Sequence, residues 1–120
     1  MPQFVLTTLA AADYRKTLRD SRQQFGQYQR DRYKTILDTA IHEVVENPHS
    51  PRSRKRDELA PGIRTYYLGG RGQRASHFLV YRLLESGIVE ITRILHVRME
   101  MVNYLPEENK FGERKPGHPQ

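Results

Sequence analysis

The sequence EITRILHVRMEMVNYLP, from Glu90 to Pro106, decides how the end of this chain is expected to fold. Together with the valine before it, the segment alternates apolar and polar residues: Val89, Ile91, Leu95 and Val97 against Glu90, Thr92 and His96. Such alternation is typical of a strand with one buried face. Beyond Arg98 it gives way to an apolar segment that carries Met99 and Met101. We therefore expect a last strand that ends beside a histidine and an arginine.

Two glycine-containing turns upstream make this strand the third of three consecutive antiparallel strands. The expected strands are 63–69 (IRTYYLG), 74–85 (RASHFLVYRLLE) and 88–97 (IVEITRILHV), with turns GRGQ at 70–73 and SG at 86–87. Tight hairpin turns need positive φ angles, which glycine accepts without steric cost. The second half of the chain therefore predicts an antiparallel sheet.

The first half predicts a short strand followed by two helices. Residues 3–7 (QFVLT) end in threonine, and Thr7 or Thr8 can cap a first helix over 9–24. One face of that helix carries Ala11, Tyr14, Leu18 and Ser21. After Gly26, the clearest helical period of the chain is formed by Phe25, Tyr33, Ile36, Leu37, Ala40, Ile41, Val44 and Val45. Asn47 ends this second helix, because a residue before proline disfavours helical angles.

The connection from Pro48 to Gly62 is polar and bracketed by prolines. It contains the cations Arg52, Arg54, Lys55 and Arg56. The expected element order is β-α-α-β-β-β, an α+β fold with a helical hairpin packed on one face of a mainly antiparallel sheet. We expect one domain over residues 1–106 and a polar, mobile tail over 107–120 that a partner could order.

The overall composition narrows the class of protein. The 120-residue chain has no cysteine, which excludes disulfides and thiolate metal sites. It has no apolar run long enough to cross a bilayer and no basic region of a secretory signal, so we expect a cytoplasmic protein without a membrane partner. Twenty Lys and Arg against 14 acids give a net charge of +6, which favours nucleic acid, nucleoprotein or an acidic protein as partner.

No metal or cofactor site is expected. The five histidines, at positions 42, 49, 77, 96 and 118, lack the short spacing of a ligand set. The glycines of LGGRGQR (68–74) match neither a dinucleotide-binding nor a phosphate-loop pattern, and a hairpin turn is the simpler interpretation. No serine lies in a nucleophile elbow.

The remaining candidates for chemistry are polar residues near the open end of the expected sheet: Arg64, Tyr66, Tyr67, Tyr81, Arg82, Arg93, His96 and Arg98. One interpretation is RNA cleavage, with His96 as general acid or base and arginines stabilising the charge on phosphorus. The other is structural, with His96 ending a strand through a backbone hydrogen bond and the arginines solvated. Composition favours the structural interpretation, and periodicity does not separate the two.

Several segments, taken in order, resemble the RelE/ParE superfamily of toxins from type II toxin–antitoxin pairs, and its ParE branch in particular. They are LAAADY (9–14), FGQYQRDRY (25–33), VVENP (44–48), RDELAPGIRTYYLG (56–69) and HFLVYRLLESGIVEITRILHVRM (77–99). Their order and spacing agree with the β-α-α-β-β-β layout. The resemblance runs from about Phe4 to Pro106 and implies a helical hairpin over a twisted antiparallel sheet.

The resemblance also implies partners. Superfamily members are held inactive by a small antitoxin whose C-terminal segment wraps the toxin, here a ParD-like antitoxin. The ParE branch poisons DNA gyrase, whereas the RelE branch cuts messenger RNA in the ribosomal A site. RelE-type ribonucleases have a basic residue where this chain has Phe78, and further basic residues and a tyrosine where it has Val97, Met99 and Glu100. Because cleavage needs that positive charge, the resemblance favours a non-enzymatic gyrase inhibitor.

On this interpretation no residue is catalytic. The candidates for target contact are His96, Arg98, Met99, Met101 and Tyr104. Met, Tyr and Arg are favoured at interfaces, although the same segment could pack back against the sheet. We expect the antitoxin in a hydrophobic groove between sheet and helices. The alternatives are a ribosome-dependent endonuclease using His96, Arg64 and Arg98, and a folded relic without activity. The cations of the 48–62 connection are either solvated or in direct contact with DNA.

Overall fold

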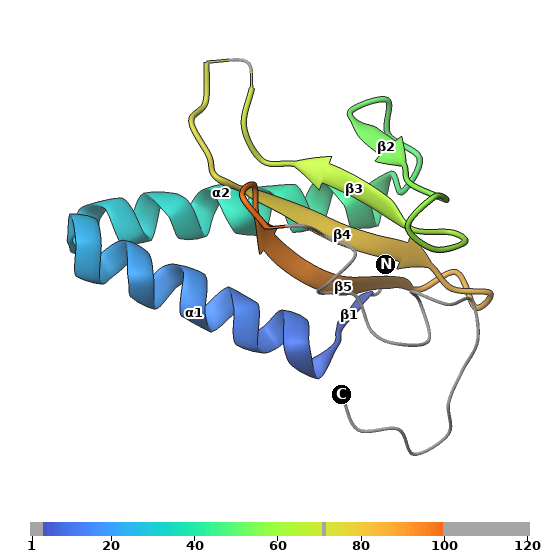
Figure 1. Ribbon diagram of the computed structural model, residues 1–120, viewed down its shortest axis with the longest axis horizontal. Helices are drawn as coiled ribbons and strands as arrows, with labels where there is room; N and C mark the ends of the chain where they lie inside the picture. Colours follow the sequence, from blue (N-terminus) through green and yellow to red (C-terminus); the bar gives the residue numbers. More distant parts are fainter. Residues whose placement is uncertain (1–3, 71, 100–120) are drawn as a thin grey trace.

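Residues 4–70 and 72–99 are described by a computed structural model, in which two helices pack on one five-stranded sheet (Figure 1). The elements in chain order are β1 (Phe4–Leu6), α1 (Thr8–Phe25), α2 (Gln27–Glu46), β2 (Ser53–Lys55), β3 (Arg64–Tyr67), β4 (His77–Leu83) and β5 (Val89–His96). The strand order is β1-β5-β4-β3-β2, with β1 parallel to β5 and the other neighbours antiparallel. The predicted α+β fold, with two helices on a mainly antiparallel sheet, is confirmed.

The connection predicted as an irregular loop contains a further strand, β2. Its residues pair antiparallel with β3, so that Ser53 lies opposite Tyr66 and Lys55 opposite Arg64. β2 forms an outer edge of the sheet, and its exposed residues Arg54 and Lys55 are charged. Charged side chains discourage an edge strand from pairing with another chain. Three residues without apolar alternation give no strand pattern, which explains why the predicted element order lacked β2.

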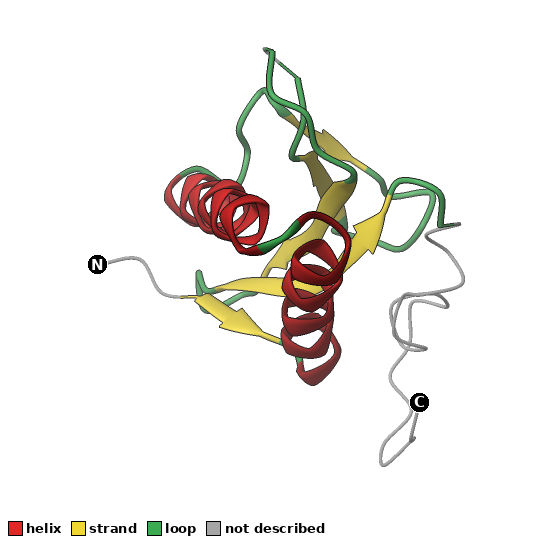
Figure 2. Cartoon of the chain, turned by 90° about the vertical axis from the view of Figure 1, so that its left-hand side faces the viewer, coloured by secondary structure: helices red, strands yellow, loops and turns green. Residues whose placement is uncertain are grey.

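Thr7 and Gly26 set the ends of α1. The Thr7 hydroxyl accepts a hydrogen bond from the Ala10 amide at 3.0 Å and donates one to the Thr92 carbonyl at 2.8 Å. Thr7 therefore caps the helix and ties it to β5. Gly26 alone joins α1 to α2, with a φ of 92° that favours glycine. Figure 2 views the molecule from this hairpin end, where the short connection is visible.

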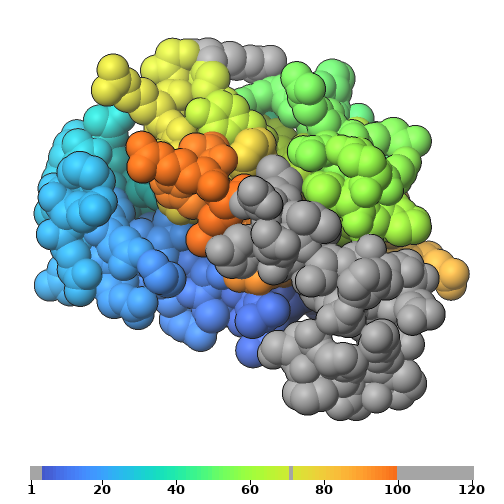
Figure 3. All heavy atoms as spheres, in the orientation of Figure 1, coloured from blue at the N-terminus to red at the C-terminus, as the bar shows by residue number. Residues whose placement is uncertain are grey.

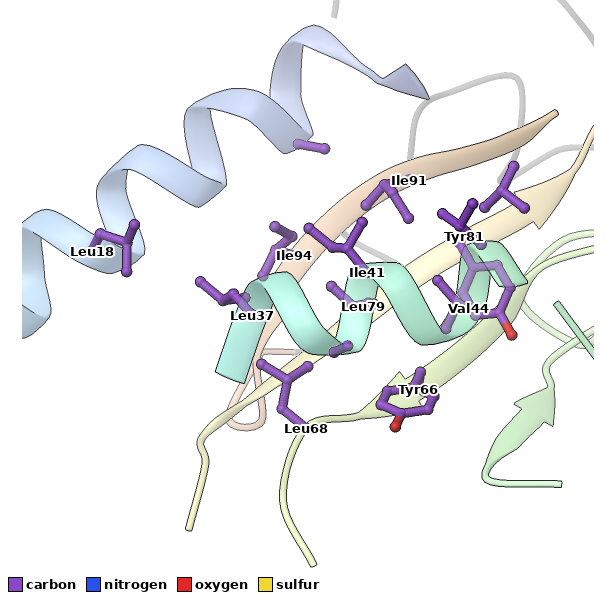
Figure 4. Packing of buried hydrophobic residues seen from close by; sticks show 14 residues of the cluster. Leu18, Leu37, Ile41, Val44, Tyr66, Leu68, Leu79, Tyr81, Ile91 and Ile94 are labelled. Carbon is purple, nitrogen blue, oxygen red and sulfur yellow. The ribbon is translucent and has the colours of Figure 1, made fainter. Parts of the chain in front are cut away.

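The main core lies between the helices and one face of the sheet (Figure 4). Its buried residues are Ala10, Leu18, Leu37, Ala40, Ile41, Val44, Val45, Tyr66, Leu68, Leu79, Tyr81, Val89, Ile91 and Ile94. The apolar period predicted for α2 is buried from Leu37 to Val45, and Tyr33 and Ile36 are partly buried against the core. Phe25 instead ends α1 and is 67% exposed. The buried residues of α1 are Ala10, Thr17 and Leu18. The buried face of α1 is therefore rotated from the predicted one, of which Leu18 alone is fully buried.

The opposite face of the sheet has a smaller core. Ala60 and Ile63, from the segment between β2 and β3, cover Val80 and Leu95, with Leu59 partly buried beside them. No helix of the described residues contributes to this cluster. One irregular segment therefore supplies the cover that two helices supply on the other face.

A β-bulge at Thr92 shifts the alternation of β5. Tyr81 pairs with Ile91, but the preceding residue Val80 pairs with Arg93, which leaves Thr92 as an extra residue. Strict alternation is lost from this point onward. The prediction that β5 buries a single apolar face is therefore wrong, because its second half contributes to both cores.

Asp13 of α1 covers the edge of β5 beyond the end of β1. After β1 has paired with Val89 to Ile91, Asp13 accepts hydrogen bonds from the Ile94 amide at 3.0 Å and from Arg93 Nε at 2.8 Å. Both side chains of the ion pair are largely buried, with 16% of Asp13 and 13% of Arg93 exposed. In this way α1 supplies an acceptor for a backbone amide of β5 beyond the end of β1.

Candidate functional site

Two histidines face each other where β4 begins and β5 ends. His77 pairs with His96, and their rings meet edge to face with centroids 5.2 Å apart. The Tyr33 hydroxyl of α2 lies 2.8 Å from His77 Nδ1 and accepts a hydrogen bond from the Ser76 amide at 2.9 Å. Since the hydroxyl receives that amide proton, its own proton can be donated to Nδ1. The Tyr33–His77 contact therefore connects α2 to the end of the hairpin.

His77 is neutral at pH 7. Burial, followed by the charge of the neighbouring His96, lowers the pKa of His77 from 6.5 to about 4. Burial is also the main cause that raises the pKa of Tyr33. Tyr33 and His77 therefore add no positive charge to this end of the sheet.

The bulge explains why sequence reasoning missed the role of His77. A regular hairpin continued from the pairing of Leu83 with Val89 would place Ser76 opposite His96. The extra residue Thr92 moves the register by one position, which brings His77 there instead. The only signal available in the sequence is the presence of one histidine in each strand of the same predicted hairpin.

His96 makes contacts with the turn that ends β5. Its Nδ1 accepts a hydrogen bond from the Arg98 amide at 3.1 Å, and its carbonyl accepts one from the Met99 amide at 3.0 Å. The turn leaves Val97, Arg98 and Met99 exposed. We call His96, Val97, Arg98 and Met99 the β5-end patch. Two candidates for target contact, Met101 and Tyr104, lie outside the described residues, as does the predicted tail at 107–120.

Arg64 does not lie beside His96. It is opposite Tyr81, which is four residues along β4 from His77, or about 13 Å at the rise of a strand. Its guanidinium donates hydrogen bonds to Ser53 Oγ, at 2.8 Å from Nη2. The structure therefore does not bring together the three residues His96, Arg64 and Arg98 named for the ribonuclease alternative.

Most other cations of the predicted polar set and of the loop after α2 have acidic partners. Arg82 pairs with Glu90 and Arg93 with Asp13, each at 2.8 Å. The pairs in the loop are Arg52 with Glu43, Lys55 with Asp57 and Arg56 with Glu58. Local carboxylates thus offset most of the positive charge that made this loop a candidate for DNA contact.

The described residues offer neither a metal cluster nor a membrane span. No group of three or more histidines and acids in 4–70 and 72–99 is arranged to hold a metal ion. No helix in these ranges is both long and apolar enough to cross a bilayer.

Similarity to known proteins identifies the family. The model of the ParE toxin of type II toxin–antitoxin systems, parDE, matches residues 4–101. Toxin ParE1 of Mycobacterium tuberculosis is 29% identical over 99 residues, which cover 82% of this chain and 93% of that protein.

Two solved structures share the fold. The chromosomal ParDE toxin–antitoxin system from P. aeruginosa matches with a TM-score of 0.64 and 18% identity, over 82% of this chain and 98% of that chain. A mutant of the E. coli toxin RelE in the free state matches with a TM-score of 0.56 and 18% identity, over 93% and 97%. The family match spans both helices and every described strand. The chain belongs to the ParE family, the toxins of type II toxin–antitoxin systems.

Proposed function

We propose that this ParE-family toxin acts without catalysis, by binding DNA gyrase, and that a ParD-like antitoxin neutralises it by covering apolar surface. Family membership supports the toxin role and the existence of an antitoxin. The observation that carries the non-enzymatic mechanism is the separation of the sheet's arginines from His96. Because gyrase acts on the chromosome, the proposed location is the cytoplasm.

A ribonuclease needs a proton-transfer group beside positive charge that stabilises the transition state. Next to His96 the chain has neutral His77, whose pKa is lowered to about 4, and then Phe78. Arg64 is bound to Ser53 about 13 Å away along the strand direction. Arg98 adjoins His96 in the β5-end patch, but Arg64 is not available to complete the catalytic set. We therefore assign no catalytic role to His96, Arg64 or Arg98.

The β5-end patch is the proposed contact with gyrase. Val97 and Met99 are apolar and 42% and 39% exposed, and Arg98 lies between them. Exposed Met and Arg are enriched in the centres of protein interfaces. His96 holds the turn through the Arg98 amide and so orients the patch. Met101 and Tyr104 follow in sequence and are included in the proposed contact.

The surface of β1 and the first turn of α1 is the proposed antitoxin site. Its apolar residues are all between 36% and 44% exposed: Phe4, Val5, Leu6 and Leu9. β1 lies at the edge of the sheet, where a partner segment can add a strand. A paired antitoxin strand would satisfy the edge and cover these side chains. We place the antitoxin here, rather than between sheet and helices, because this apolar surface is already open.

The first experiment is gyrase-catalysed supercoiling and DNA cleavage with purified toxin, repeated after antitoxin is added. We expect inhibition with trapped cleaved DNA, reversed by the antitoxin. Val97→Asp combined with Met99→Asp should raise the toxin concentration needed for inhibition at least tenfold, because charge is placed inside the contact. Leu83→Asp is the matched control, since Leu83 is 41% exposed at the other end of β4.

The ribonuclease alternative is tested with translating ribosomes and the His96→Ala variant. A nuclease that uses His96 would lose cleavage by orders of magnitude on this change. We expect instead that messenger RNA stays intact with the wild-type toxin and with the His96→Ala variant. A folded, growth-arresting toxin that leaves gyrase unaffected would overturn the proposal, and a folded chain that arrests nothing would be a relic.

A further inference from the structure

A groove along the helical hairpin is lined mainly by arginines. The hollow between α1 and α2 has a volume of about 570 Å³. Its polar lining consists of Arg15, Arg19, Arg22, Arg30, Tyr14 and Gln23. The first three arginines are spaced i, i+4 and i+7 on α1, so they form one stripe along the helix. All three are exposed, and the stripe presents them over about 10 Å.

This arginine stripe lacks local acidic partners, unlike the loop after α2. Among the residues that the structure describes, no carboxylate forms an ion pair with Arg15, Arg19 or Arg22. The nearby acids are paired otherwise: Asp20 with Lys16, Asp31 with Arg30 and Asp38 with Lys34. Residues 15–32 contain six basic and two acidic residues, a net charge of +4, whereas residues 8–46 as a whole contain seven basic and six acidic residues. The positive charge of the two helices is therefore concentrated at the end of the hairpin around Gly26.

Aromatic and amide side chains extend the stripe to the tip of the hairpin. Phe25 is 67% and Tyr28 is 72% exposed, and the Arg32 guanidinium lies 6.0 Å from the Tyr28 ring centroid. Glutamines surround the turn at positions 23, 24, 27 and 29. In the space-filling view this end, coloured blue to cyan, forms the left side of the molecule (Figure 3).

This combination of side chains suits nucleic acid better than an acidic protein. Arg, Gln and Tyr are common donors to phosphate oxygens, and exposed aromatic rings can stack on bases. A stable protein interface would need a larger apolar centre than the two exposed rings of Phe25 and Tyr28 provide. The repeated arginines also match a partner whose charges recur along a chain.

We propose that the hairpin, through Arg15, Arg19 and Arg22 with Phe25 and Tyr28 at its tip, binds the phosphate backbone of nucleic acid without sequence specificity. The surface is distinct from the β5-end patch and from β1. The inference goes beyond the proposed function and does not depend on it, because binding is measured on nucleic acid alone. On a toxin bound to gyrase, such a surface would hold adjoining DNA.

The test is fluorescence anisotropy of purified toxin with labelled duplex and single-stranded oligonucleotides of unrelated sequences, over about 50 to 200 mM salt. We expect similar affinities for unrelated sequences and a steep loss of affinity with salt. The variant that combines Arg15→Gln, Arg19→Gln and Arg22→Gln should bind at least tenfold more weakly at the lowest salt. Its slope of log K against log salt should be shallower by about two to three, because three phosphate contacts are lost.

The matched control removes the same charge from the loop, with Arg54→Gln, Lys55→Gln and Arg56→Gln. It should lose much less affinity, because Asp57 and Glu58 already neutralise two of those cations. Thermal melting verifies that both variants are folded. Equal losses in the two variants, or no binding by the wild type, would overturn the proposal. Poly-glutamate that binds as tightly as DNA would also overturn it, in favour of an acidic protein partner.

Discussion

The two faces of the sheet are stabilised very differently. Among the described residues, the helix-covered face buries fourteen core residues, whereas the opposite face buries four under the segment between β2 and β3. Polar contacts differ between the two faces in the same way, because Asp13 and Tyr33 connect the helices to the sheet through part-buried hydrogen bonds. The difference teaches that the helix-covered face supplies most of the stability. Substitutions on the opposite face and at the strand ends should therefore have a smaller effect on the free energy of unfolding.

The largest effect is expected from a cavity under the helices. Leu79 and Leu95 are both fully buried, but they lie on opposite faces of the sheet. Leu79→Ala should lower the free energy of unfolding by about 4 kcal/mol, and Leu95→Ala by about 2 kcal/mol, because an irregular segment collapses onto a cavity more easily than two helices do. Urea unfolding of both variants measures the difference. Equal losses would break the comparison.

The next largest difference in unfolding free energy is expected between polar contacts on the two faces. Asp13→Ala removes the carboxylate that binds both Arg93 and the Ile94 amide at a largely buried site, and should lower the free energy of unfolding by about 3 kcal/mol. Asp57 is the counterpart on the other face, where it accepts a hydrogen bond from the Gly62 amide at an exposed position. Asp57→Ala should cost less than about 1 kcal/mol. Thermal melting of the two variants ranks them, and a larger loss for Asp57→Ala would contradict the division between faces.

The helix-covered face should also carry a pH dependence through His77. Folding lowers the pKa of His77 from 6.5 to about 4, so between these values the unfolded chain binds one more proton than the folded chain. The free energy of unfolding therefore contains the full contribution of neutral His77 above pH 6.5, and this contribution is lost as the pH falls toward 4. Because the ring is partly exposed, we expect the loss to be roughly 2 kcal/mol.

Urea unfolding at several pH values measures this dependence, with His77→Gln as the comparison. The variant should lack the His77 part of the slope between pH 6.5 and 4.5 while keeping the part that comes from carboxylates. The same slope in both proteins would show that His77 is not buried as a neutral ring.

The smallest effect is expected on the solvent side of α1. Lys16 and Asp20 form an ion pair at 2.6 Å, but their side chains are 65% and 44% exposed. Lys16→Ala should change the free energy of unfolding by less than about 0.5 kcal/mol, because solvent screens the pair. If Lys16→Ala lowered the free energy of unfolding as much as Asp13→Ala does, solvent exposure would not explain which polar contacts of α1 stabilise the fold.

The fold was largely predictable because its main elements have strong local patterns. The apolar period from Leu37 to Val45 is buried as predicted, and the two glycine turns connect antiparallel strands. β2 gave no signal, because its pairing with β3 depends on a neighbour rather than on its own residues. The bulge at Thr92 was missed for a related reason, since an extra residue looks the same as a regular one in a single sequence.

The candidate site was less predictable than the fold. The sequence indicated His96, but the residues around it depend on register and on a helix distant in the chain. The His77 pairing follows from the bulge, and Tyr33 reaches it from 44 residues away. The ion pair of Arg93 with Asp13 also joins residues that are distant in the chain, whereas the pair of Arg82 with Glu90 lies within one hairpin.

The single glycine between α1 and α2 restricts insertions and deletions at this point of the chain. Each residue of an α-helix turns about 100° around the helix axis. One added residue would therefore rotate the apolar stripe of α2 away from the sheet, unless the whole helix slid along it. Related toxins are expected to vary in length at the ends of the strands rather than at Gly26. The turn can thus serve as a fixed reference point for aligning toxins whose sequences have otherwise diverged.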